Sequence, residues 1–229
     1  MLPIMSESLS RVEIEVDGGA VPTDVLGERN AGRPGLVVIP SIFGPAPDLL
    51  RRLSEFGDRA LVTVPDPFWR VGGGVVAYSD HSAAVGRMAG FDVGACTSDL
   101  RAVVDWTRAH GNGRVVGVGI CFGGPFVLRF AGDGALDGVV TWHGSRMQNF
   151  LRRARETSCP LRFHFGSDDP VTPPDAIEAV RQAFSEHADC SIVVHPGVVH
   201  GFSHDGAAYD EKACRAGLDA VGELLARVS

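Results

Sequence analysis

Short apolar runs alternate along the chain with segments in which apolar residues recur every three to four positions. The runs are rich in Val, Leu and Ile, a composition typical of β-strands. They predict strands over Val12–Val16, Leu36–Ile39, Ala60–Val64, Arg114–Gly119, Gly138–Trp142, Leu161–Phe165 and Ser191–Val194. The periodic segments predict helices over Asp48–Phe56, Asp99–His110, Gly123–Ala131, Met147–Glu156, Pro174–His187 and Tyr209–Arg227.

The order of these elements predicts the fold class. Val12–Val16 alternates apolar and acidic residues, as an edge strand does, whereas Leu36–Ile39 is apolar throughout, as in a strand buried on both faces. Strands followed by helices indicate βαβ units, and therefore an α/β fold whose central sheet is mostly parallel with helices on both faces. We expect a single domain over residues 1–229, with residues 1–10 as a flexible N-terminus. Ligands of such sheets bind beyond the carboxyl ends of the strands.

Composition narrows the choice of partners and compartment. The net charge of −7 and the lack of a basic block argue against a nucleic-acid partner. No apolar run approaches the ~20 residues of a membrane helix, and the first residues lack the basic and apolar regions of a secretory signal. The five cysteines are odd in number, scattered and without a CxxC pair, which argues against a disulfide framework and a structural zinc site. We therefore expect a cytoplasmic protein without nucleic-acid or membrane partners.

The most informative segment is the turn around Cys121. The strand Arg114–Gly119 runs directly into Gly-Ile-Cys-Phe-Gly-Gly. A nucleophile on a sharp strand-to-helix turn needs small residues two positions before and after it, because side chains there would collide with the neighbouring strand and helix. Gly119 and Gly123 hold these positions. The helix dipole and free N–H groups would favour a thiolate at Cys121, and the Phe122 N–H would face a developing oxyanion.

Two other interpretations of cysteines and glycines compete here. An isolated cysteine is usually an inert core residue, and this is our interpretation of Cys96, Cys159, Cys190 and Cys214. Glycines after a strand also occur in dinucleotide-binding loops, but those loops open the first βαβ unit, and an acidic residue ends the next strand. Here the turn lies in the middle of the chain, and the next strand ends in Trp142-His143.

A thiol nucleophile needs a base within reach and an acid that orients the base. The loop after Phe165 carries Asp168 and Asp169, either of which could instead be an ordinary turn or capping residue. The loop after Val194 carries His200, where an α/β-hydrolase would place the base.

The other histidines offer fewer possibilities. His143 ends a predicted strand and could line a pocket. The spacing of His195, His200 and His204 also suggests a metal site, but the intervening Pro and Gly residues prevent one regular helical face, and no zinc motif fits this spacing. We therefore predict no metal and no cofactor.

Together these residues resemble the dienelactone hydrolase family of α/β-hydrolases. The matching segments follow the family's order at similar spacing, from about Val12 to the C-terminus. They are Ile42-Phe43-Gly44, Gly119-Ile120-Cys121-Phe122-Gly123-Gly124, Asp169 with Pro173 four residues on, and His200-Gly201-Phe202. The cysteine is the specific part of the resemblance, because most α/β-hydrolases carry serine at this turn.

The resemblance implies an α/β-hydrolase fold and a role for each matching residue. Cys121 would be the nucleophile, His200 the base and Asp169 its orienter, with Asp168 as the less favoured acid. The oxyanion hole would use the backbone N–H groups of Ile42 and Phe122. Residues expected to contact the substrate are Ser41, His81, Gly201, Phe202 and His204.

The sequence departs from the family pattern at three of these positions. Ser41 stands where the best-known members carry a Glu that helps control the state of the thiol. His81 and His204 fall, by ungapped alignment, where two arginines hold the substrate carboxylate. A neutral imidazole is a weaker anion clamp than a guanidinium, and Arg70 or Arg87 could take over that role.

The leading hypothesis is a hydrolase that cleaves a small ester or lactone, the dienelactones included, through a Cys-His-Asp triad and a thioacyl intermediate. Its partner would then be a small-molecule substrate; the sequence carries no signal for an oligomeric state. The alternative is a catalytically weak or silent relative that binds or senses a small molecule, which slow labelling of Cys121 would indicate. A nicotinamide-dependent oxidoreductase would instead be stabilised by its cofactor.

Overall fold

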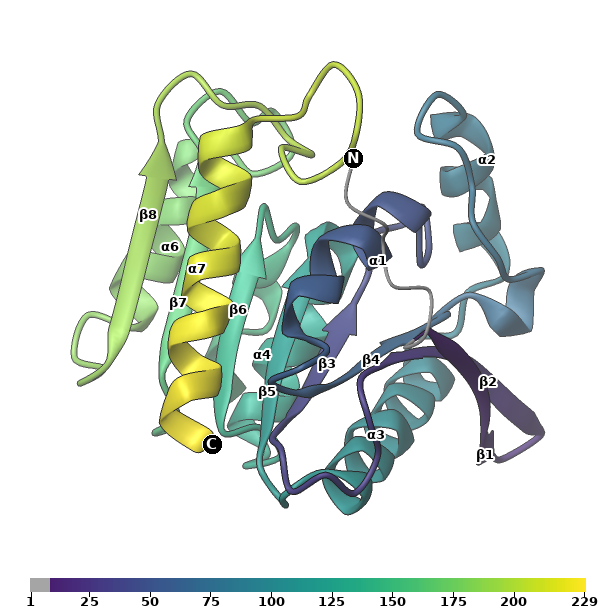
Figure 1. Ribbon diagram of the computed structural model, residues 1–229. Coiled ribbons are helices and arrows are strands. Elements are labelled where there is room, and N and C mark those ends of the chain that lie inside the picture. Colours follow the sequence, from purple (N-terminus) through teal and green to yellow (C-terminus); the bar gives the residue numbers. More distant parts are fainter. Residues whose placement is uncertain (1–8) are drawn as a thin grey trace, which may run out of the picture.

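A computed structural model describes residues 9–229 of the chain. Most of the segment expected to form a flexible N-terminus, residues 1–8, lies outside the described residues. The strands form one sheet in the order β1-β2-β4-β3-β5-β6-β7-β8 (Figure 1). Their bounds are β1 Ser10–Val16, β2 Gly19–Leu26, β3 Gly35–Ile39, β4 Leu61–Pro65, β5 Val115–Ile120, β6 Gly138–Trp142, β7 Leu161–Gly166 and β8 Cys190–His195.

The predicted α/β class and mostly parallel sheet are confirmed. Strands β3 to β8 run parallel to one another, while β2 runs antiparallel to both β1 and β4. β1 is an edge strand, as predicted. The sequence analysis missed β2, because Pro22 and the Gly18-Gly19 pair at its start weaken its strand signal. Pro22 pairs with Glu13 of β1. The pairing of β2 with β4 starts one residue later, at Thr23.

The helices cover both faces of the sheet (Figure 1). Their bounds are α1 Pro47–Leu53, α2 His81–Gly86, α3 Val93–His110, α4 Gly124–Gly132, α5 Leu151–Ala154, α6 Pro174–Ala183 and α7 Glu211–Val228. Alternate residues of each central strand face opposite sides. Leu36 and Val38 of β3 pack into the core beneath α1 and α7, and Val37 and Ile39 pack into the core beneath α3, α4 and α6.

Three helical segments differ from the prediction. α3 begins at Val93 rather than Asp99, because the Asp92 side chain caps it by accepting the N–H groups of Gly94 and Ala95. α2 was not predicted; Asp80 caps this short helix. The single helix predicted over Met147–Glu156 is wrong. The structure has a 3₁₀ turn over residues 147–149 and the four-residue α5, and Phe150, with a φ of −118°, separates the two.

The loops that follow β5, β6, β7 and β8 all leave the same edge of the sheet, because these strands are parallel neighbours. Side chains far apart in the sequence therefore meet at this edge. None of the helices within residues 9–229 is long and apolar enough to cross a membrane.

Candidate active site

Cys121 occupies a strained turn between β5 and α4. Its φ is +49°, a conformation that non-glycine residues rarely adopt outside functional sites. A Cβ added at Gly119 would lie 2.6 Å from the Gly123 carbonyl oxygen, and one added at Gly123 would collide with the Ile39 carbonyl. The two glycines therefore let the turn approach β3 and α4 closely, and the turn holds the thiol at the sheet edge.

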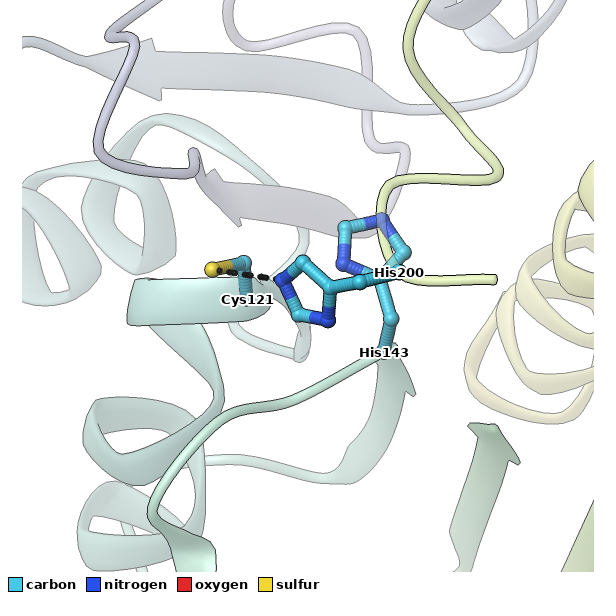
Figure 2. Close-up of side chains that lie close together, drawn as sticks. All are labelled: Cys121, His143 and His200. Carbon is cyan, nitrogen blue, oxygen red and sulfur yellow. Dashed lines mark hydrogen bonds between the residues drawn. The ribbon is translucent and has the colours of Figure 1, made fainter. Parts of the chain in front are cut away.

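Cys121 meets a histidine and an aspartate that come from the loops after β8 and β7. His200 Nε2 lies 3.2 Å from Cys121 Sγ (Figure 2), and His200 Nδ1 lies 2.7 Å from Asp169 Oδ2. The other Asp169 oxygen accepts the N–H groups of Val171 and Thr172 at 2.7 and 3.1 Å. The structure thus joins the three residues into one hydrogen-bonded chain.

Asp169, rather than Asp168, is the acid in contact with the histidine. Asp169 is buried, with 4% of its surface exposed. Asp168 is exposed and accepts a hydrogen bond from the Ser167 hydroxyl at 2.7 Å. The two neighbouring carboxylates therefore differ sharply in environment.

His200 is poised to carry a proton. Burial lowers its pKa, but the hydrogen bonds with Asp169 and Cys121 outweigh burial and raise the pKa to about 9. At neutral pH the imidazolium form is thus favoured, and its Nε2–H can donate to the Cys121 sulfur.

The loop expected to supply one side of the oxyanion hole is fixed by Arg87. The guanidinium of Arg87 donates to the Ile42 carbonyl oxygen through Nε, at 3.1 Å, and through Nη2, and to the Gly74 carbonyl oxygen at 3.1 Å. It also lies 4.0 Å from the centre of the Phe68 ring. Arg87 thus holds the backbone of this loop in place. The other candidate for an anion clamp, Arg70, forms an ion pair with Asp99 at 2.8 Å.

A cavity of about 920 Å³ opens beside Cys121 and His200. Three of the residues expected to contact substrate line it, namely His81, Gly201 and His204, as do Ile42 and Phe122. Ser41 and Phe202 lie behind its surface, with 3% and 0% exposure. The Ser41 hydroxyl accepts the Phe43 N–H at 3.4 Å, and the Phe202 ring packs against His143.

Part of the cavity wall was missed by the sequence analysis. Tyr78 stacks on His204 with ring centres 4.5 Å apart and donates to Asp48 at 2.8 Å. Asp48 also accepts from Arg52 at 3.0 Å. Burial lowers the pKa of His204 to about 4, so this ring is neutral at pH 7. Tyr78, in a glycine-rich region without strong periodicity, carries no sequence signal that would assign it to the site.

Arg146 was likewise missed. It lines the cavity, is exposed, and has a φ of +54° at the start of the turn after β6. In the sequence it stands one residue before the predicted helix Met147–Glu156, and no motif marks it as a site residue.

His143 lies next to His200, on the loop after β6. Its ring is fully buried, 4.7 Å from the His200 ring centre, and its Nε2 lies 2.9 Å from the Ser203 hydroxyl. Burial and the neighbouring His204 and His200 hold the pKa of His143 well below its usual range. Cys121, His143 and His200 each offer a ligand atom within 4.8 Å of the others (Figure 2).

The strand order and the turn at Cys121 define the class of protein: this is an α/β-hydrolase fold. The chain belongs to the dienelactone hydrolase family, which it matches over residues 22–229. The resemblance found in the sequence is thereby confirmed.

Named relatives and solved structures agree with this assignment. The carboxymethylenebutenolidase of Pseudomonas sp. strain P51 is 27% identical over 169 residues, 71% of this chain and 70% of the relative. Carboxymethylenebutenolidase 1 of Cupriavidus pinatubonensis is 26% identical over 202 residues, 84% of this chain and 86% of the relative. These relatives support a hydrolase.

The fold is shared with a Klebsiella pneumoniae protein assigned to the dienelactone hydrolases. Its structure superposes with a TM-score of 0.81 at 21% identity, covering 95% of this chain and 98% of that one. The dienelactone hydrolase-like promiscuous phosphotriesterase P91, from metagenomic libraries, gives a TM-score of 0.74 at 23% identity, with 96% and 98% coverage. At these identities the likeness concerns the fold.

Proposed function

We propose that this protein hydrolyses small carboxylic esters or lactones through a covalent thioester on Cys121. The observation that carries the proposal is the chain of contacts from Cys121 Sγ to His200 Nε2, at 3.2 Å, and from His200 Nδ1 to Asp169, at 2.7 Å. A nucleophile, a base and a buried orienter in this order form a triad suited to acyl transfer.

In the first half of the reaction, the Cys121 thiolate attacks the substrate carbonyl carbon. The carbonyl oxygen becomes an oxyanion, for which Ile42 and Phe122 supply backbone N–H groups. The intermediate collapses, the carbon–oxygen bond to the leaving group breaks, and protonated His200 gives its Nε2 proton to the leaving oxygen. An alcohol departs, or the lactone ring opens, and the acyl group remains on sulfur.

In the second half, neutral His200 takes a proton from water, and the resulting hydroxide attacks the thioester carbonyl. The carbon–sulfur bond breaks, the acid leaves and the imidazolium–thiolate pair is restored. Asp169 keeps the Nδ1–H of His200 in place and stabilises the positive ring in both halves. No cofactor is needed in this scheme.

The size and lining of the cavity favour a small substrate with an apolar body. Its volume of about 920 Å³ is of the size that holds small ligands. Phe43, Tyr78 and the neutral His204 form an aromatic wall. Arg146 carries a permanent positive charge among the described residues that line the cavity, and we propose that it meets the carboxylate of an anionic substrate such as a dienelactone.

The cytoplasm is the proposed location, because a thiol nucleophile works in a reducing compartment. All five cysteines are free. The proposed partner is the small-molecule substrate, without a nucleic acid or a membrane.

Initial rates of wild type and Cys121→Ala with a dienelactone, p-nitrophenyl acetate and an acyl thioester test the proposal. We expect the variant to lose at least ~10³-fold in kcat/KM with every substrate that the wild type turns over. Arg146→Ala should raise KM for the dienelactone and leave KM for p-nitrophenyl acetate unchanged. Retention of most activity by Cys121→Ala would refute the mechanism.

The same experiment tests the second candidate, a silent relative that binds a small molecule. The specific observation in its favour is Ser41 in place of an acidic residue, because Ser41 is buried and cannot take a proton from the thiol at neutral pH. A silent relative would show no Cys121-dependent rate with any substrate, and its Cys121 would react slowly with iodoacetamide near pH 7.

A further inference from the structure

We propose that Cys121, His143 and His200 form a binding site for Zn²⁺ or a similar transition-metal ion, which reversibly blocks the thiol. The three side chains come from the loops after β5, β6 and β8 and converge at the sheet edge (Figure 2). Their ligand atoms all lie within 4.8 Å of one another. The binding of the ion stands on this geometry alone, whereas the inhibition rests on the proposed function.

The decisive observation is the unused nitrogen of His143. The Nε2 of His143 is engaged with Ser203 at 2.9 Å, while its Nδ1 is buried and has no hydrogen-bond partner within the described part of the chain. Buried polar atoms are almost always paired, so an unpaired one needs an explanation. When Nε2–H donates to Ser203, Nδ1 carries a free lone pair, which is the form that binds a metal.

His200 already has the surroundings of a metal ligand. The ring nitrogen that does not face Cys121 is held by the buried carboxylate of Asp169 at 2.7 Å. A carboxylate on the far nitrogen fixes the tautomer of a metal-bound histidine and raises its basicity. The arrangement that orients a base for catalysis therefore also orients a ligand.

The distances fit after a small adjustment. Tetrahedral zinc with bonds of about 2.3 Å to sulfur and about 2.0 Å to nitrogen sets its ligand atoms roughly 3.3–3.5 Å apart. Cys121 Sγ and His200 Nε2 are already 3.2 Å apart. The separations from His143 are within 4.8 Å, so a movement of at most roughly 1.5 Å at His143 closes the remaining gap.

Binding of the metal ion releases one proton for each ion bound. Metal–sulfur and metal–nitrogen bonds replace the proton shared between Cys121 and His200, and that proton passes to solvent. The sulfur lone pair is then committed to the metal, so the thiolate no longer attacks a carbonyl. A chelator that removes the ion restores the starting state.

Cobalt tests the site without any turnover, because Co²⁺ takes zinc-like coordination and is visible in the absorption spectrum. We expect the reduced wild type to show a near-ultraviolet band from thiolate-to-cobalt charge transfer at one equivalent of Co²⁺. Cys121→Ala should lose this band. His143→Phe should weaken Zn²⁺ binding, measured by competition with a chromogenic chelator, by at least ~10-fold.

Two further variants separate ligation from disturbance. His110→Gln removes a histidine of α3 that stacks on Trp106, away from the cluster, and should leave the affinity unchanged. Ser203→Ala disturbs the surroundings of His143 but keeps all three ligands, and should retain the cobalt band. Ser203→Ala is also the variant to be measured if His143→Phe does not fold.

The site is refuted if folded wild type shows no cobalt–thiolate band, if the band persists in Cys121→Ala, or if folded His143→Phe binds Zn²⁺ as tightly as wild type. Inhibition is tested separately with p-nitrophenyl acetate, and a chelator should restore the full rate. If Co²⁺ binds at Cys121 while hydrolysis continues, the metal site stands, but the blocking role and the thiol mechanism are both overturned.

Discussion

The two sides of the cavity are built in different ways. On one side, Cys121 sits in a turn whose shape is set by its own neighbours, with φ at +49° between Gly119 and Gly123. On the other side, Tyr78 and His204 come from segments far apart in the chain; Tyr78 donates a hydrogen bond to Asp48 of α1 and stacks on His204. The Cys121 side thus depends on local backbone sterics, and the Tyr78–His204 side on long-range side-chain contacts.

The strongest test of the Cys121 side uses two adjacent carboxylates. Asp169→Asn should lower kcat/KM by about 10²–10⁴-fold, because the amide no longer stabilises the positive ring of His200. Asp168→Asn should stay within about twofold of wild type, since the Asp168 side chain is exposed and bonds to Ser167. Equal losses in the two variants would contradict the assignment of Asp169 as the orienter.

The next largest effect is expected from one added methyl group. Gly123→Ala should destabilise the fold by about 1–3 kcal/mol, because its Cβ would collide with the backbone of β3. Gly86→Ala, in α2 on the cavity wall, adds the same methyl group where nothing lies within 4 Å, and should leave stability equal or slightly higher. Urea unfolding of both variants measures this contrast, and a tolerated Gly123→Ala would show that the turn is not sterically constrained.

A smaller effect is expected where the two sides meet. Arg87→Met removes the donors that hold the Ile42 carbonyl but keeps an apolar stem over Phe68. We expect kcat for p-nitrophenyl acetate to fall roughly 10-fold with KM almost unchanged, because a positioning group for the oxyanion hole acts on the transition state. A change confined to KM would make Arg87 a contributor to substrate binding instead.

The smallest effect concerns the Tyr78–His204 side and the dependence of stability on pH. The folded-state pKa of His204, about 4, lies below the ordinary value of 6.5 because of burial. Between these values the unfolded chain binds a proton that the folded chain does not, so stability falls as the pH drops from about 6.5 to about 4. His204→Phe should reduce this slope by up to about 1.4 kcal/mol per pH unit. The free energy of unfolding at pH 7, 6 and 5 measures the slope, and an unchanged slope would show that His204 takes no part.

The same contrast explains what could be predicted from the sequence. The parallel sheet followed from apolar runs, and Cys121 followed from glycines only two residues away, so both signals were local. Asp169 and His200 could be placed because the loops after parallel strands share one edge. The family resemblance then chose Asp169 over Asp168, and burial explains the choice.

The cavity wall could not be predicted in this way. Tyr78 reaches His204 only through the packing of α1 against the loop after β8, and no spacing in the sequence encodes that contact. Ser41 was expected to touch substrate because it adjoins a matching motif, and Phe202 because it belongs to one, yet both side chains are buried behind the cavity surface. Arg146 precedes the predicted helix Met147–Glu156, and its place on the cavity wall follows from the turn after β6, which no spacing in the sequence encodes.

The central claim, that Cys121 carries the acyl group, is tested most directly by trapping the intermediate. Wild type would be mixed with p-nitrophenyl acetate, quenched in acid within the first turnovers, digested and examined by mass spectrometry, with Cys121→Ala as the control. The account predicts one acetyl group on the peptide that contains Cys121 and none on the other four cysteines. Steady hydrolysis by wild type and by Cys121→Ala, with no acetyl group on Cys121, would contradict it.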